Sequence, residues 1–239
     1  MGIAALTPPR VVDKRGAMGD LRGPVAVLAS GGLDSAVLLV EMARTAGRAV
    51  PIVVRAGHPW EEAEGAALRR FVAAVADPRI APVRELALPM GDVYGRHWSM
   101  TGDAPAWHEP DETIEIRGRN LVLLTKALVL AAIEGWPTLA MGSLAGNPFP
   151  DATPEFFAHL GELSSGALDA HLAIVTPYRG LHKEDVIRRG EGLPLDLTLS
   201  CAAPTADALH CGACNKCRER AEAFAAAGVT DPTRYAHGR

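Results

Sequence analysis

The chain has 239 residues, enough for one large domain or for one domain with a small appendage. Its composition is 48% hydrophobic and 22% charged, which argues against a disordered chain, a collagen-like chain and a coiled coil. Lysine and arginine total 24 against 28 acidic residues, and the resulting net charge of -4 argues against a general binder of duplex nucleic acid.

Two features predict a cytoplasmic protein without a membrane partner. The longest apolar stretch, 121–133, is interrupted by Lys126 and is shorter than the roughly 20 residues that a bilayer span needs. The N-terminal region has no secretory pattern, because Pro8, Pro9 and Arg10 interrupt it. Thiols stay reduced in the cytoplasm, so the cysteines call for an explanation other than disulfides.

Taken in chain order, the pattern begins with a flexible leader over residues 1–22, where prolines, glycines and mixed charges show no periodicity. Apolar runs of strand length then alternate with helical patterns. Strands are expected at 25–29, 50–54, 83–88, 138–141 and 172–175, and helices at 34–47, 61–76, 119–134, from Pro154 onward and at 183–189. This alternation predicts an α/β fold with a doubly wound parallel sheet, whose ligands bind at the carboxyl ends of the strands.

A glycine-containing turn follows the first predicted strand. It consists of Ser30, Gly31, Gly32, Leu33, Asp34 and Ser35. Glycines adopt backbone angles closed to other residues, so successive N–H groups can point at one anion, and the next helix adds positive charge at its N-terminus. The turn lacks the Gly-Lys-Ser/Thr ending of a Walker loop and the G-x-G-x-x-G spacing. We interpret it as a cradle for phosphate or pyrophosphate, in preference to a plain tight turn.

This turn resembles the pyrophosphate-binding loop of the PP-loop ATP pyrophosphatases. Enzymes of that superfamily cleave ATP between its α and β phosphates and attach AMP to a substrate. The resemblance implies an adenine nucleotide alpha hydrolase-like sheet and a loop that binds the phosphates of ATP, together with Mg²⁺. Donors aimed at the leaving oxygen would stabilise the charge that develops there.

All four cysteines lie in one C-terminal segment, at Cys201, Cys211, Cys214 and Cys217. Two-residue gaps let neighbouring thiolates turn onto one ion and Cys201 completes a tetrahedron, so we predict a structural Zn²⁺ site without an open position. A [4Fe–4S] cluster also uses closely spaced cysteines. Unrelated buried or redox-active thiols are a further alternative.

The charges near the cysteines bear on a nucleic-acid role. Lys216, Arg218 and Arg220 are interspersed with Glu219 and Glu222. Such a mixture is typical of a solvated helix face, so we expect no direct nucleic-acid partner.

The turn and the cysteines together resemble the QueC/ExsB family, the 7-cyano-7-deazaguanine synthases of the queuosine pathway. The resemblance covers residues 24–236 in order. Its further matches are the run 210–224 with Gly228, 231–233 and Tyr235, Gly118-Arg119-Asn120, Pro150-Asp151, Pro154-Glu155-Phe156, Pro177 with Lys183, and Leu197-Thr198 before Ser200.

The resemblance implies a ligase that converts 7-carboxy-7-deazaguanine, ammonia and ATP into the nitrile. Adenylation gives the carboxylate a leaving group, ammonia attacks to form the amide, and a second adenylation of the amide oxygen permits dehydration. AMP and pyrophosphate leave in each round. The resemblance also suggests a homodimer. Along the chain we expect three parts: the leader 1–22, a nucleotide-binding domain 23–195 and a zinc module 196–239.

The resemblance also assigns roles to single residues. Asp34, Lys183 and Arg119 are expected to act on the phosphates or the substrate carboxylate. The alternatives are a surface lysine for Lys183 and a salt bridge at the start of a helix for Arg119. Substrate-binding roles are expected for His58, Asn120, Phe149, Asp151 and Glu155. The alternative for Glu155 is a favourable interaction with the helix dipole alone.

The match weakens on the substrate side. Residues 55–60 (Arg-Ala-Gly-His-Pro-Trp) stand where the family has Tyr-Gly-Gln-x-His, and residues 144–149 replace its Asp-Tyr-Ser-Gly-Tyr run. The aromatic ring at Phe149 still suits a purine-like base. Residues 90–117, with two tryptophans and two histidines, are expected to form a packed surface loop rather than a lid.

These departures leave two other hypotheses open. A QueC-like paralogue would adenylate a deazaguanine-type or other carboxylate and transfer the acyl group to a different amine. A non-catalytic, zinc-bearing interaction module would not need Asp34.

Overall fold

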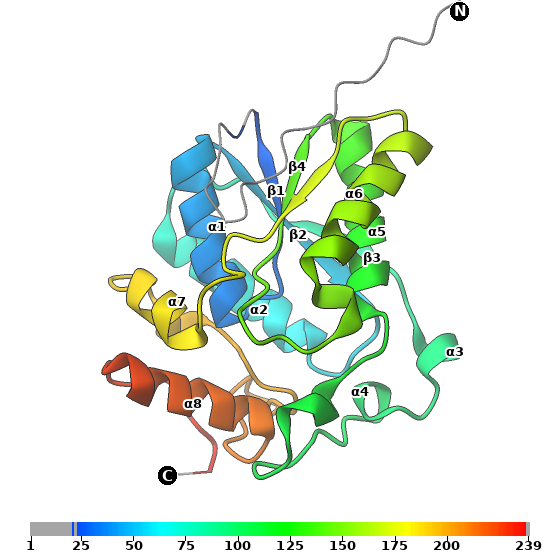
Figure 1. The fold of residues 1–239 in the computed structure, drawn as a ribbon. Coiled ribbons are helices and arrows are strands. Elements are labelled where there is room, and N and C mark those ends of the chain that lie inside the picture. The colour runs from blue at the N-terminus through cyan, green and yellow to red at the C-terminus, as the bar shows by residue number, and fades with distance from the viewer. Residues whose placement is uncertain (1–20, 22, 238–239) are drawn as a thin grey trace, which may run out of the picture.

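The computed structural model describes residue 21 and residues 23–237. Five parallel strands form one sheet in the order β3-β2-β1-β4-β5. Their bounds are β1 (Val25–Leu28), β2 (Ala49–Arg55), β3 (Arg84–Ala87), β4 (Thr138–Ala140) and β5 (Ala173–Val175). Because the order of the strands reverses between β1 and β4, the connections run over both faces of the sheet (Figure 1). The predicted doubly wound parallel fold is therefore confirmed.

Two groups of helices enclose the sheet. One face packs against α1 (Leu33–Ala46), α2 (Glu61–Val75) and α7 (Lys183–Arg189), and the other against α5 (Arg119–Glu134) and α6 (Pro154–Ala167). The remaining helices are α3 (Gly91–Tyr94), α4 (Trp98–Thr101), α8 (Asn215–Ala227) and the 3-10 turns η1 (Asp111–Ile114), η2 (Pro150–Ala152) and η3 (Leu195–Leu197). In Figure 1, α8 lies beyond α7 at one end of the molecule.

Strand alternation divides the core into two clusters. Val25 and Val27 of β1 pack in the cluster under α1, whereas Ala26 packs in the cluster under α5. All three side chains have no exposed surface. Successive side chains of a strand point to opposite faces, so β1 is apolar on both sides, as a central parallel strand requires.

Local signals place the helix ends where the sequence predicts them. Gly47, with a φ of +74°, ends α1 in the left-handed conformation that favours glycine. At the start of α6, the Thr153 hydroxyl accepts the N–H of Phe156 at 3.1 Å, and Pro154 occupies the first helical position. Gly47 turns the chain back into β2 at the amino ends of the strands, whereas Thr153 follows the loop at the carboxyl end of β4, the edge where the site lies.

The predicted leader, 1–22, lies outside the described residues apart from Leu21, which packs against the cluster under α1. Within the described part of the chain, no helix has the length and apolar character that a membrane crossing requires.

Residues 90–117 pack against the C-terminal segment, as expected for a packed loop. Trp98 and Trp107 contact the cluster that contains the cysteines. The N–H of Asn215 donates to the carbonyl of Pro105 at 3.1 Å. Ala223 and Phe224 of α8 belong to the main core, so the C-terminal segment packs closely against the sheet domain. The boundary between residues 195 and 196 stays a prediction.

Candidate active site and metal site

The phosphate loop, residues 30–35, connects β1 to α1 at the point where the strand order reverses. Gly31 has a φ of +91°, and a Cβ atom at this position would lie 2.3 Å from the carbonyl oxygen of Glu64 on α2. No side chain can be accommodated so close to a backbone oxygen. The turn therefore needs glycine at position 31 for both its backbone angle and its packing.

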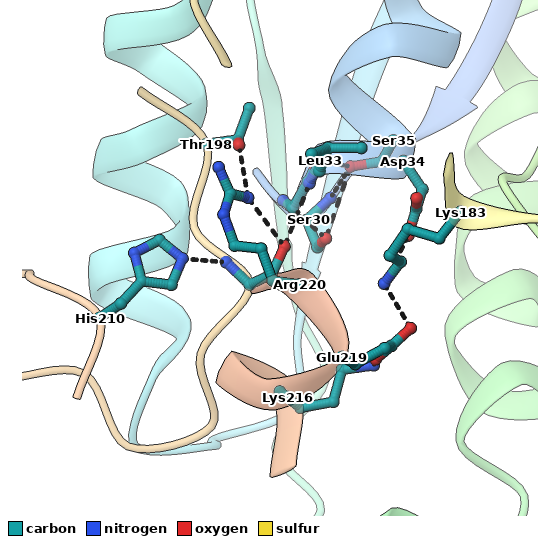
Figure 2. Close-up of polar contacts among 12 residues, drawn as sticks. Ser30, Leu33, Asp34, Ser35, Lys183, Thr198, His210, Lys216, Glu219 and Arg220 are labelled. Carbon is teal, nitrogen blue, oxygen red and sulfur yellow. Dashed lines mark hydrogen bonds and ion pairs between the residues drawn. The ribbon is translucent and has the colours of Figure 1, made fainter. Parts of the chain in front are cut away.

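Hydroxyl groups accept hydrogen bonds from three amides of this loop. Ser30 N donates to Ser35 Oγ at 3.3 Å, Gly32 N to Ser30 Oγ at 3.2 Å, and Leu33 N to Ser200 Oγ at 3.4 Å (Figure 2). These bonds are at or beyond the long end of the usual N–H···O range, about 2.7–3.2 Å. A charged phosphate oxygen is a stronger acceptor than a hydroxyl. The loop thus holds amide donors that suit an anion.

Lys183 lies buried beside the loop, at the start of α7. Its Nζ is 3.3 Å from Asp34 Oδ2 and 2.5 Å from Glu219 Oε1 on α8 (Figure 2). Burial alone would lower the pKa of Lys183, but the two carboxylates raise it above its ordinary value. The lysine is therefore charged, and its 9% exposed side chain shows that the alternative of a surface lysine is wrong.

The second carboxylate of this group, Glu219, joins two lysines. Its Oε2 forms an ion pair with Lys216 of the same helix. Burial alone would raise the pKa of Glu219, yet Lys183 and Lys216 bring it well below its usual range. The other oxygen of Asp34, Oδ1, is buried and has no hydrogen-bond partner. A buried, unpartnered carboxylate oxygen is costly, so it marks a place for a cation or a donor.

The C-terminal segment also contacts the backbone of the loop directly. Leu199 N donates to the Gly31 carbonyl at 2.9 Å, and Ser200 Oγ accepts from Leu33 as described above. Arg220, only 1% exposed, donates to Thr198 Oγ1 at 3.0 Å and to Ser200 Oγ at 3.4 Å. These contacts join the α8 side of the molecule to the phosphate loop.

His58 lies in the loop after β2, with 4% of its surface exposed. Its Nδ1 is 3.0 Å from the carbonyl oxygen of Ser99, which only accepts, so Nδ1 carries the proton. Burial, and then the charge of Arg119, lower the pKa of His58, so the ring is neutral. Nε2 is buried without a partner and is therefore available as an acceptor. The ring stacks on Trp60 at 4.7 Å between centroids.

Arg119 and Asn120 open α5. Within the described residues, Arg119 forms no ion pair and its Nε is buried without a partner, so the predicted alternative of a salt bridge is wrong there. Asn120 N donates to Asp151 Oδ2 at 2.8 Å, and Asn120 Nδ2 donates to the Asp151 carbonyl at 3.1 Å. The structure thus brings Asn120 and Asp151 together, and the two residues hydrogen-bond to each other.

Two other predicted substrate residues, Phe149 and Glu155, lie on the face of the sheet that α5 and α6 cover. Phe149 is half-buried and packs against the cluster under α5, whereas Glu155 is exposed in the first turn of α6. Their roles in substrate binding, and those of His58, Asn120 and Asp151, stay predictions.

The sequence analysis missed two polar side chains near the loop. Glu64, half-buried on α2, has its pKa raised to about 8, chiefly by burial, and Arg119 and Lys216 counteract part of that shift. Ser143 follows β4, is 2% exposed, and its hydroxyl has no partner. A lone Glu in a helix and a lone Ser in a loop carry no spacing signal, so only the folded chain identifies them.

The charged residues of α8 correct another prediction. They were expected to form a solvated face, but Arg220 is 1% exposed and Glu219 is partly buried between two lysines. Glu222 does lie exposed. The expectation is wrong because α8 packs against α7 and the phosphate loop, a long-range contact that local charge spacing does not reveal.

The four cysteines converge as predicted. Their sulfur atoms all lie within 4.8 Å of one another, and three of the four residues are buried. Cys201 Sγ and Cys214 Sγ are 4.0 Å apart, and Cys211 Sγ and Cys217 Sγ are 3.8 Å apart. This group could hold a metal ion.

Comparisons with known proteins agree with this arrangement. Residues 24–228 match the family model described as "Queuosine biosynthesis protein QueC". The chain belongs to the QueC family. The 7-cyano-7-deazaguanine synthase of Thiobacillus denitrificans is 36% identical over 226 residues, which cover 88% of this chain and 97% of that protein. The 7-cyano-7-deazaguanine synthase of Myxococcus xanthus is 33% identical, and the match covers 87% of this chain and 96% of that protein.

Among solved structures, the similarity is weaker. A predicted subunit of a tRNA methyltransferase from Methanocaldococcus jannaschii has 16% sequence identity and a TM-score of 0.45. The match covers 69% of this chain and 72% of that one. Membership of the QueC family therefore rests on the family model and the curated relatives.

Proposed function

We propose that this QueC-family protein is a 7-cyano-7-deazaguanine synthase, which converts 7-carboxy-7-deazaguanine, ammonia and ATP into the nitrile. The observation that carries the proposal is the phosphate loop with Asp34 and buried Lys183 at the switch point of the sheet, in a chain of this family. Loop amides and a buried cation suit the charge that develops when pyrophosphate leaves. The enzyme would act in the cytoplasm.

The first half-reaction would join the carboxylate oxygen to the α-phosphorus of ATP and break the bond to the β-phosphate oxygen. The loop amides and Lys183 would bind the departing pyrophosphate. Asp34, whose Oδ1 is unpartnered, would hold Mg²⁺ that accompanies the triphosphate. Arg119, which has no ion pair among the described residues, would bind the substrate carboxylate or the α-phosphate.

Ammonia would then attack the acyl carbon, AMP would leave, and the amide would form. A second ATP would adenylate the amide oxygen in the same site. Loss of this second AMP together with the two N–H protons gives the nitrile. Each of the two AMP molecules therefore carries away one oxygen of the original carboxylate. The neutral His58 offers an acceptor at Nε2 for an N–H group of the base.

We infer that the metal is Zn²⁺. Zn–S bonds of about 2.3 Å give a sulfur tetrahedron with edges of about 3.8 Å. The two measured sulfur separations, 4.0 Å and 3.8 Å, suit one ion at the centre. A four-iron cluster would hold its thiolates farther apart, because each binds a different iron atom. With four thiolates Zn²⁺ has no open position, so its part would be structural.

The experiment that tests the function is turnover by the purified protein. With the deazaguanine carboxylate, ammonia and Mg-ATP, we expect AMP, pyrophosphate and the nitrile, identified by mass spectrometry. Asp34→Asn should abolish all three products, with Asp92→Asn on α3 as a control. Two outcomes would instead indicate a QueC-like paralogue. One is pyrophosphate release that depends on another acid and not on the deazaguanine carboxylate. The other is a product that carries a different amine.

A further inference from the structure

Lys216 belongs to the metal-binding segment, residues 199–227, and joins the ion-pair group around Lys183 through Glu219. It lies between two of the cysteines, Cys214 and Cys217, in the first turn of α8. Its side chain is 28% exposed and pairs with Glu219. Figure 2 shows Lys216 and Glu219 on the side of α8 that faces Lys183.

One carboxylate thus holds two ammonium groups side by side. Glu219 Oε1 is 2.5 Å from Lys183 Nζ, while Oε2 contacts Lys216 Nζ. Lys183 in turn contacts Asp34, which belongs to the phosphate loop. Lys216 is therefore connected to the loop through two carboxylates and one lysine, all close to it in space.

Electrostatics also connect Lys216 with α2. The charge of Lys216 lowers the pKa of Glu64 and offsets part of the rise that burial causes. The backbone oxygen of Glu64 is the atom that excludes a side chain at Gly31.

The lysines of this group are already paired, so an anion would share them with Asp34 and Glu219. Two lysines and two carboxylates, Asp34 and Glu219, compensate each other. Pyrophosphate carries several negative charges and needs more cations than one lysine and one Mg²⁺ supply. Lysine acts as a mobile point charge with three donors, so it can keep one carboxylate and still contact a phosphate.

We propose that Lys216 is a second cationic ligand for the departing pyrophosphate, supplied by the metal-binding segment and positioned beside Lys183 by Glu219. This inference rests on the proposed function. It would give the cysteine cluster a role in the reaction, because an ion bound to Cys214 and Cys217 would hold the first turn of α8 in place. The expected loss in Lys216→Met is about 10-fold to 100-fold in affinity for pyrophosphate, the range of one charge-assisted contact.

The first test measures the binding of inorganic pyrophosphate with Mg²⁺ by calorimetry, and KM and kcat for ATP. Lys216→Met should bind pyrophosphate at least about 10-fold more weakly, while Lys216→Arg keeps most of the affinity. Lys126→Met on α5 is the matched control, because Lys126 lies away from the loop and should leave affinity unchanged. Equal affinity in Lys216→Met and the wild type, with the metal retained, overturns the proposal.

A second measurement needs no variant and is therefore independent of folding. An amine-reactive reagent is applied to the wild-type protein with and without Mg-pyrophosphate, and labelled lysines are identified by mass spectrometry. We expect pyrophosphate to protect Lys216 but not Lys126. Equal labelling of Lys216 in both samples overturns the proposal. A wild-type protein that binds neither pyrophosphate nor ATP instead overturns the proposed function.

Discussion

The phosphate loop and the metal-binding segment meet in one site but are held in different ways. The loop depends largely on local geometry, namely the positive φ of Gly31 and the hydrogen bonds within residues 30–35, to which the C-terminal segment adds the contacts of Leu199 and Ser200. The metal-binding segment depends on distant contacts, with four thiols collected over 17 positions and Arg220 bonded back to residue 195. A short motif therefore specifies most of the loop, whereas the segment depends on residues that lie farther apart along the chain.

The difference shows which parts of the site fail together. A change in the loop should disturb nucleotide binding and leave the metal in place. A change in the cysteines should release the metal and also loosen the loop, because Leu199 and Ser200 contact its backbone. These contacts couple the two regions, and the predictions below test how a change in each region affects the other.

The largest expected effect is that of Cys214→Ser. Loss of one thiolate should release the ion and unfold the segment after residue 199, because structural Zn²⁺ contributes about 10–16 kcal/mol in zinc-finger peptides. Elemental analysis should find less metal, limited proteolysis should cut within 200–237, and nitrile formation should be lost. A variant that keeps one equivalent of metal and full activity would refute the structural role of the ion.

Gly31→Ala should come next. The added Cβ would lie 2.3 Å from the Glu64 carbonyl oxygen at a φ of +91°, so the loop must shift and the variant should lose about 2–4 kcal/mol of stability. Calorimetry should detect no ATP binding, while elemental analysis finds the metal retained.

The control for this variant is Gly47→Ala. Gly47 also has a positive φ, of +74°, but nothing lies within 4 Å of a Cβ built there. The expected loss is about 1 kcal/mol with unchanged ATP affinity. If Gly31→Ala binds ATP like this control, the close packing of the loop on α2 is unimportant for nucleotide binding.

The same contrast explains how far the sequence alone predicts the site. The loop and the cysteine group were predictable, because glycine conformation and thiol spacing are local. The bounds of α5 and α7 also agree with the sequence-based ranges 119–134 and 183–189, since apolar periodicity and caps are local signals. The pairing of Glu219 with Lys183 was not predictable, because 36 residues separate them and only the packing of α8 against α7 joins them.

Arg220→Met tests the contacts that connect the two regions. Four bonds of the Arg220 guanidinium would be lost, namely the buried bonds to Thr198 and Leu195 and the partly buried bonds to Thr233 and Ser200. The expected destabilisation is about 3 kcal/mol in urea unfolding. The control Arg188→Met removes an exposed arginine that pairs with Asp185 and should cost below about 1 kcal/mol. Equal losses in the two variants would show that Arg220 does not connect the regions.

The smallest expected effect is that of Glu64→Gln, at the junction of the two regions. The folded protein raises the pKa of Glu64 from 4.5 to about 8, chiefly by burial. Between these values the folded state keeps a proton that the unfolded chain releases, so the wild type loses stability as the pH rises from 4.5 to about 8. Glutamine does not ionise, and because the site is half-buried the variant should gain about 1–2 kcal/mol relative to the wild type at pH 8.5.

At pH 5.5 the gain of Glu64→Gln should be smaller, because the wild-type carboxyl group is still protonated when folded and the unfolded chain has only begun to gain from ionising. Urea unfolding at both pH values measures the difference. Glu62→Gln, on the same helix with a 78% exposed side chain, is the control and should change stability by less than about 0.5 kcal/mol at either pH. The same gain in Glu64→Gln at both pH values would mean that Glu64 is ionised in the folded protein. Its carboxylate would then offset the charge of Arg119 and Lys216, and the cationic site for pyrophosphate would be weaker than the two lysines suggest.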